Sequence, residues 1–95
     1  MIYVNNKIIE LYKNYIKLNY NIYISLLDSA KILNISKLNI LYDLKTEITT
    51  YYINSLIYKL NSVKINNSAY ISLGDLIKLV NGEINEFDND IYINY

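Results

Sequence analysis

Apolar residues recur with helical spacing along much of this chain, most clearly between residues 49 and 61. Four aliphatic residues there follow the i, i+3, i+4, i+7 pattern of a single buried strip: Ile53, Leu56, Ile57 and Leu60. Thr49 is a suitable N-cap, so the pattern predicts a helix from Thr49 to about Asn61. The opposite side of that helix would carry Tyr51, Asn54, Ser55 and Tyr58.

Residues 6–20 predict an earlier helix that is apolar over an unusually wide arc, about 200° against the ~100° of a surface helix. One apolar strip can pack on the core of this chain, and a neighbouring strip then needs another partner. That second strip consists of Ile9, Tyr12, Ile16 and Tyr20. The helix is either sunk deep in a small core or forms a subunit interface, and we favour an interface, hence a homodimer.

Ser25 predicts the start of a further helix, because Asp28 follows three residues later as an acidic form of the capping box. Asn34 is a suitable end for it, since Asn tolerates positive φ better than most residues. Ser36 predicts the cap of the next helix, which would run to about Lys45. Leu38, Leu41 and Leu44 would face inward on it.

Residues 63–71 predict a β-hairpin. Asn66 and Asn67 form its centre, and both suit the positive φ angles of a type I′ turn. Ser72 then predicts the cap of a last helix, which ends at Asn81 and Gly82. We find no internal repeat and no linker.

This order of elements resembles the winged helix-turn-helix family. In one alignment, residues 24–44 resemble the opening of an excisionase-type or MerR-type domain, and residues 63–82 resemble its hairpin and closing helix. In the other, which we prefer because it needs no insertion, residues 41–60 resemble the turn and recognition helix that lead into the wing. The resemblance implies a mostly α fold with a small hairpin: a tri-helical core plus wing, an extra N-terminal helix at 6–20 and a C-terminal helix. The winged domain would span residues 1–82, followed by an acidic tail at 83–95.

The same resemblance implies a surface for double-stranded DNA, made from the wing, the recognition helix and the turn between the helices before it. The wing would contribute Lys64, Asn66, Asn67, Ser68 and Tyr70. The recognition helix would contribute Tyr51, Asn54, Ser55, Tyr58 and Lys59, and the turn would contribute Lys31 and Lys37. The outward strip of the recognition helix contains no cation, and Tyr, Ser and Asn equally suit a protein-binding surface.

Composition narrows the chemistry further. The 95 residues include no Cys and no His, which argues against an enzyme, a thiolate site and the usual zinc sites. We expect no cofactor, no metal and no small-molecule substrate. Lys and Asn interrupt every apolar run, so we expect no membrane span and a cytoplasmic location. The favoured residues have A/T-rich codons, which suggests a bacterial, plasmid or phage genome.

Charge is unevenly distributed although the formal net charge is zero. The nine Lys all precede residue 83, whereas the tail carries Glu83, Glu86, Asp88 and Asp90. We therefore expect a small DNA-binding protein that acts as a dimer. It would be a transcriptional regulator or an accessory factor marking a plasmid or phage site for replication, partition, transfer or excision. The alternative is a winged-helix protein-binding module, such as a phage inhibitor of a host system.

Overall fold

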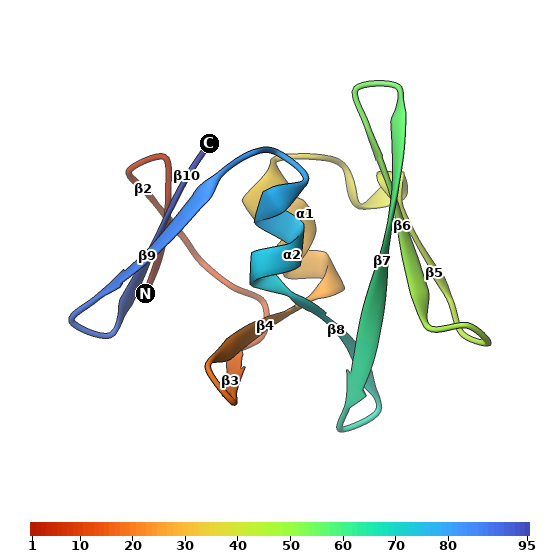
Figure 1. The fold of residues 1–95 in the computed structure, drawn as a ribbon, viewed down its shortest axis with the longest axis horizontal. Helices are drawn as coiled ribbons and strands as arrows, with labels where there is room; N and C mark the ends of the chain where they lie inside the picture. The colour runs from red at the N-terminus through yellow and green to blue at the C-terminus, as the bar shows by residue number, and fades with distance from the viewer.

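The computed structural model describes residues 1–95 and contains ten β-strands, two α-helices and one 3-10 turn (Figure 1). The elements are β1 (Ile2–Val4), β2 (Lys7–Ile9), β3 (Ile16–Leu18), β4 (Asn21–Ser25), α1 (Leu26–Leu33), η1 (Lys37–Asn39), β5 (Ile40–Asp43), β6 (Ile48–Ile53), β7 (Leu56–Ile65), β8 (Ser68–Ser72), α2 (Leu73–Lys78), β9 (Glu83–Phe87) and β10 (Asp90–Asn94). The expectation of a mostly α, winged helix-turn-helix fold is therefore wrong.

The predicted recognition helix at 49–61 is instead the hairpin of β6 and β7. Asn54 and Ser55 have φ angles of 49° and 67°, which no right-handed helix accommodates. They form the turn, and Ile53 pairs with Leu56 on either side of it. Every second residue of β6 then faces inward, so the helical spacing of the aliphatic residues was coincidental.

The predicted helix at 6–20 is also wrong, because its two ends form the strands β2 and β3, and Asn19 and Tyr20, with φ angles of 50° and 70°, form the turn after β3. Ile9 lies on β2, Tyr12 in a connecting segment and Ile16 on β3, so the four residues proposed as a dimer strip share no helix face. The dimer itself stays an untested prediction.

Five two-residue turns join neighbouring strands, and both residues of each have positive φ, as type I′ turns require. The turns are Asn5-Asn6, Asn19-Tyr20, Asn54-Ser55, Asn66-Asn67 and Asp88-Asn89. The hairpin predicted at Asn66-Asn67 is confirmed. Asn and Asp tolerate positive φ, and that chemistry sets most of the fold.

Both short helices begin where the sequence predicts. The Ser25 side chain accepts a hydrogen bond from the Asp28 backbone at the start of α1, and Asn34 ends it with a φ of 55°. Ser72 caps α2 in the same way. Ser36 is also a cap, but only of η1, because the chain continues as β5. Leu38, Leu41 and Leu44 are consequently exposed rather than inward.

The strands form two sheets, with the orders β2-β1-β10-β9 and β3-β4-β8-β7-β6-β5. Residues 83–94 are not a separate acidic tail. They form β9 and β10, and β10 pairs in parallel with β1. Ile91 and Ile93 of β10 belong to the core, so the N- and C-terminal parts of the chain are joined in one sheet.

The two helices lie side by side above β4 and β8, with β1, β2, β9 and β10 on one side and β5, β6 and the start of β7 on the other (Figure 1). The core lies between them and consists of buried Ile2, Val4, Ile22, Ile24, Ile32, Leu33, Tyr51, Ile71, Leu73, Leu76, Ile77, Ile91 and Ile93. This arrangement is close to two-fold symmetric.

The symmetry reflects an internal repeat, contrary to the expectation from the sequence. Residues 16–35 align without a gap on residues 63–82, a shift of 47 residues; the first segment includes β3, β4 and α1, and the second includes the end of β7, β8 and α2. Identical pairs are Lys17/Lys64, Asn19/Asn66, Tyr23/Tyr70, Ile24/Ile71, Ser25/Ser72, Leu26/Leu73, Asp28/Asp75, Lys31/Lys78 and Asn34/Asn81. The helix ends match as well, because Ile35 N–H donates to the Ala30 carbonyl and Gly82 N–H to the Ile77 carbonyl, both at 3.0 Å.

Candidate functional site

The residues predicted to bind DNA do not form one surface. The Asn54-Ser55 turn and the Asn66-Asn67 turn lie at opposite ends of β7. A ten-residue strand is about 33 Å long at ~3.3 Å per residue, so the two turns are far apart. Tyr51 is fully buried. No recognition helix is present to join these positions.

The remaining predicted residues are also spread over several elements. Lys59 lies on β7 opposite Thr50, and Tyr58 is half-buried opposite Tyr51. Lys37 is exposed in η1. Ser68 accepts a hydrogen bond from the Lys13 amino group, at 2.9 Å. Predicted DNA binding therefore stays untested, and the helix that motivated it does not exist.

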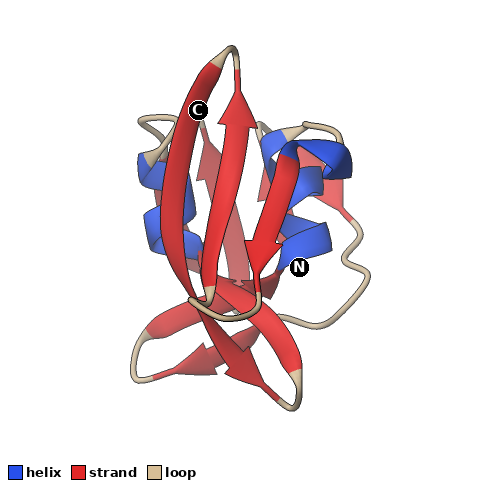
Figure 2. Cartoon of the chain, turned by 90° about the vertical axis from the view of Figure 1, so that its right-hand side faces the viewer, coloured by secondary structure: helices blue, strands red, loops and turns tan.

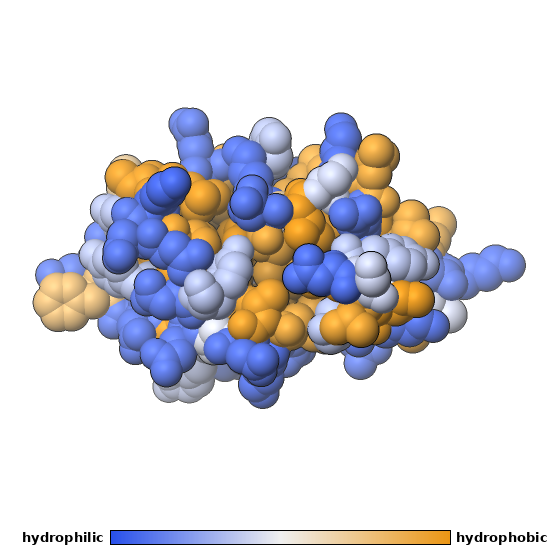
Figure 3. Space-filling view, turned by 90° about the horizontal axis from the view of Figure 1, so that it is seen from above, coloured by the Kyte–Doolittle hydropathy of each residue, from blue (hydrophilic) through white to orange (hydrophobic).

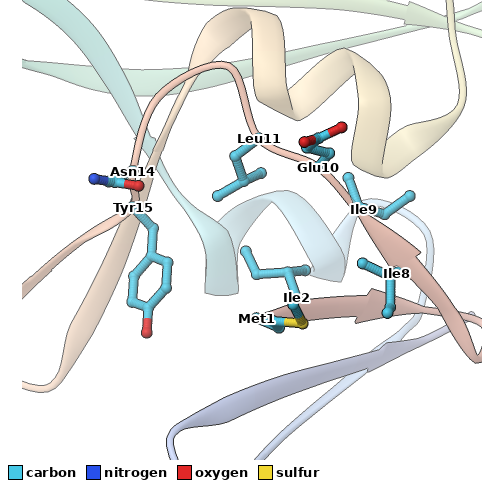
Figure 4. A pocket seen from close by; sticks show the side chains of 8 residues that line it. All are labelled: Met1, Ile2, Ile8, Ile9, Glu10, Leu11, Asn14 and Tyr15. Atoms are coloured by element: carbon cyan, nitrogen blue, oxygen red, sulfur yellow. The ribbon is translucent and has the colours of Figure 1, made fainter.

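A cavity of about 490 Å³ opens instead beside the edge strand β2 (Figure 4). Six of its eight lining residues are apolar. They come from the N-terminal residue, β1, β2 and the connecting segment 10–15, which we call the strap: Met1, Ile2, Ile8, Ile9, Glu10, Leu11, Asn14 and Tyr15. The pocket is therefore a gap between the strap and the first two strands.

The strap is held in place by the start of α1. The fully buried Asp28 carboxylate accepts hydrogen bonds from the backbone N–H of Tyr12, at 2.7 Å, and of Lys13, at 3.1 Å. The Ser25 hydroxyl donates a third, at 2.8 Å. A buried carboxylate is costly unless it accepts hydrogen bonds. Asp28 therefore holds the strap in place, and the strap N–H groups supply the hydrogen bonds that the buried carboxylate needs.

Lys31, one turn further along α1, fastens the other side of the strap. Its amino group donates to the Glu10 carbonyl and lies 3.9 Å from the centre of the Tyr12 ring. The cation and the ring face attract each other, as in other cation–π pairs. Lys31, predicted as a phosphate contact, thus has a structural role in this fold.

The pocket arises because the repeat is imperfect. Between its turns the first unit has twelve residues, 7–18, whereas the second has ten, 56–65. The second unit uses its ten residues as the unbroken strand β7, and the first divides its twelve into β2, the strap and β3. Asp75, the equivalent of Asp28, is exposed and holds no strap. The two extra residues therefore coincide with the pocket.

The backbone of Ile8 faces away from the sheet next to this pocket. Val4 and Lys7 flank a two-residue turn, so they form the hydrogen-bonded pair of the hairpin. Ile8 follows Lys7 in β2 and lies opposite Tyr3 as a non-hydrogen-bonded pair. Its N–H and C=O consequently point outward along the free edge of the sheet, and its side chain is 57% exposed.

A second groove, of about 400 Å³, lies where the two helices end. It is lined by Leu33, Asn34, Ile35, Ile53, Asn54, Leu56, Tyr58, Leu79, Val80, Asn81 and Tyr95. Seen from above, apolar side chains reach the surface over the middle of the molecule, among polar ones (Figure 3). Residues 56–61 of β7 border it and pair with β6 alone, but no strap encloses this groove as one encloses the pocket beside β2.

Sequence reasoning did not identify this pocket, although its parts carry a signal. The motif Tyr-Ile-Ser-Leu-x-Asp occurs at 23–28 and again at 70–75, and aligning the two copies reveals the longer first unit. Neither helix is long and apolar enough to cross a membrane. Comparisons of the chain with family models, with curated proteins and with solved structures find no match.

Proposed function

We propose that this chain is a non-catalytic protein-binding module that takes an extended segment of a partner protein as an added strand along β2. One bulky apolar side chain of that segment fills the pocket between β2 and the strap. The observation that carries the proposal is the apolar cavity of about 490 Å³ directly beside an outward-facing strand backbone.

Strand addition uses both features at once. The Ile8 N–H donates to the partner segment and the Ile8 carbonyl accepts from it, which supplies affinity without regard to sequence. The pocket supplies selectivity, because it has the size of a typical ligand cavity, roughly 300–1,000 Å³, and rewards an apolar side chain. A single exposed Glu10 at its wall disfavours an acidic neighbour in the bound segment.

The use of lysines favours a protein partner over DNA. Lys17 pairs with Glu86 at 2.8 Å, Lys31 binds the Glu10 carbonyl, and Lys13 donates to Ser68. These three cations have partners within the chain. DNA binding relies on cations that neutralise phosphates, so a chain of zero formal charge in which three of the nine lysines are engaged is better suited to a protein partner.

The test begins with a displayed library of random twelve-residue peptides selected on the immobilised full chain. Isothermal titration then measures binding of the selected peptides to two variants. Ile8→Pro removes the outward N–H while leaving the β1–β2 ladder intact, and we expect affinity to fall roughly 10-fold or more. Ile57→Pro is the matched control, because Ile57 occupies the same place relative to its turn in β7 but lies beside no strap.

We expect the selected peptides to share a bulky apolar residue. Their affinity should be lower for Ile8→Pro than for the unmodified chain and unchanged for Ile57→Pro. Equal binding by both variants contradicts it. A failure to select any peptide, together with tight binding of an A/T-rich DNA duplex that weakens steeply with salt, moves the function to nucleic acid.

A further inference from the structure

Three leucines are exposed at the end of the molecule opposite to the pocket. Leu38, Leu41 and Leu44 are 81%, 55% and 66% exposed, and they lie within and on either side of β5. Figure 2 views this end directly, with β5, β6 and β7 in front. Several exposed large apolar side chains at one end of a small domain are typical of an interaction surface.

β5 is also a free sheet edge. The pairs Ile53–Leu56, Tyr51–Tyr58 and Thr49–Leu60 carry the bonds between β6 and β7, counting from their two-residue turn. The alternate residues of β6 therefore bond to β5, where Thr50 faces Leu41 and Ile48 faces Asp43. This alternation leaves the backbone groups of Ile40 and Tyr42 pointing outward, apart from the Ile40 N–H, which caps η1 by donating to the Lys37 carbonyl.

The other outer strands either belong to the proposed peptide site or carry charged residues, and the stretch of β7 that is unpaired on one side, residues 56–61, carries Lys59. β2 belongs to the proposed peptide site. β3 has Lys17 at its centre and β9 has Glu83 and Glu86, and a salt bridge joins Lys17 to Glu86. Charged residues on an edge strand discourage further pairing. β5 has only Asp43, at its very end.

We propose that β5 pairs with β5 of a second copy of this chain, antiparallel about a two-fold axis that passes beside Leu41. This inference is independent of the proposed peptide site. In this register Tyr42 lies opposite Ile40 of the partner subunit, so the Tyr42 N–H donates to that Ile40 carbonyl, and the symmetric bond forms as well. Leu41 meets Leu41 of the partner subunit.

The leucine spacing supports this register, because Leu38 and Leu44 are each three residues from Leu41. A two-fold at Leu41 brings Leu38 of one subunit to the end where Leu44 of the partner subunit lies. Lys37 lies at the end where Asp43 and Lys45 of the partner subunit are located, so charges of both signs meet there, and the zero net charge adds no overall repulsion between copies.

Such a dimer would join two six-stranded sheets into one and leave the pocket beside β2 free in each subunit. The pocket and β5 lie on opposite sides of the helices along the longest axis of the molecule, which extends over 38 Å (Figure 1). The two peptide sites then face away from each other at the far ends of the dimer. A two-headed module of this kind gains avidity for partners with repeated segments.

The test uses the expected contact between Leu41 of one subunit and Leu41 of the partner subunit. Sedimentation equilibrium from 1 to 300 µM is expected to show a dimer for the unmodified chain and monomers for Leu41→Glu and Leu41→Lys alone, because each places two like charges together. An equimolar mixture of the two variants is expected to dimerise again. Ile57→Glu, on the same sheet face but away from β5, is the control that remains a dimer.

A single-cysteine variant gives an independent readout, since the chain contains no Cys. Leu41→Cys is expected to form an intersubunit disulfide under mild oxidation, because non-hydrogen-bonded antiparallel pairs bring Cα atoms to about 4.5 Å. Lys59→Cys is expected to stay uncrosslinked. A monomeric unmodified chain at 300 µM, or a dimer that survives Leu41→Glu, overturns the proposal. Ile8→Pro leaves dimerisation unchanged, so this result and the peptide result are separate.

Discussion

Ile24 and Ile71 lie opposite each other in the antiparallel pair of β4 and β8, and both side chains are fully buried. They are equivalent positions of the 47-residue repeat, so a local two-fold axis passes between them. The flanking pairs obey the same symmetry, because Tyr23 faces Ser72 while Ser25 faces Tyr70. Two similar units thus share one core, and functional differences between them reside where the symmetry fails.

Asp28 and Asp75 are equivalent in the repeat, but only Asp28 is buried and binds the strap. Replacing Asp28 therefore tests how much the strap contributes to stability. Asp28→Asn removes one of the two carboxylate oxygens that accept the strap N–H groups, leaving a buried donor unpaired. We expect a loss of about 1–3 kcal/mol in the free energy of unfolding, measured by urea denaturation. Asp75→Asn at the exposed equivalent position is the control and is expected to change stability by less than about 0.5 kcal/mol.

Tyr20 is a bulky residue held in the left-handed region, with a φ of 70°, in the turn between β3 and β4. Its side chain is 95% exposed, so replacing it removes little packing. Tyr20→Asn is expected to stabilise the chain by about 0.5–1 kcal/mol, because Asn tolerates this conformation. The reverse change at the equivalent position, Asn67→Tyr, is expected to destabilise by a similar amount. Melting temperatures that move in the same direction for both variants contradict this explanation.

The buried hydroxyl of Tyr51 makes the free energy of unfolding depend on pH in the alkaline range. Burial raises the pKa of its hydroxyl from 10.0 to about 12, although the hydrogen bond to Ser29 lowers it slightly. Between pH 10 and 12 the unfolded chain loses this proton and the folded chain keeps it, so stability is complete below pH 10 and falls as pH rises. The loss is about 2 kcal/mol at pH 12 and approaches about 3 kcal/mol above it.

Denaturant titrations of Tyr51→Phe check this effect. The variant is expected to be about 1 kcal/mol less stable at pH 7, where it lacks the hydrogen bond to Ser29. From pH 10 to 12 its stability is expected to fall less steeply than that of the unmodified chain. Parallel curves across that range contradict the assignment to Tyr51.

The sequence predicts those parts of this fold that depend on neighbouring residues. Ser25 and Ser72 cap their helices, and Asn66-Asn67 forms its hairpin turn, because each interaction spans only two or three residues. The helices predicted at 6–20 and 49–61 failed because aliphatic spacing alone does not distinguish a helix from two short strands. The Asn-led pairs at 19–20 and 54–55 carry the same turn chemistry as Asn66-Asn67 and would have shown the difference.

The pocket depends on contacts that local patterns do not contain. From the sequence, Asp28 is predicted only to cap a helix. In the structure its carboxylate also accepts hydrogen bonds from the backbone N–H groups of Tyr12 and Lys13, sixteen and fifteen positions earlier in the chain. The parallel pairing of β1 with β10 joins residues about 90 positions apart. The comparison of the two repeat units indicates that the first unit is two residues longer here than the second, which forms the unbroken β7.

The most direct test of the peptide-binding function is amide hydrogen exchange, followed by NMR, with and without a selected peptide. In the free chain the Ile8 amide points away from its sheet and is expected to exchange quickly. We expect bound peptide to slow exchange at Ile8, to leave exchange of the equivalent Ile57 amide unchanged and to move the chemical shifts of Leu11 and Tyr15. Peptide binding that leaves Ile8 exchange unaltered would contradict strand addition along β2.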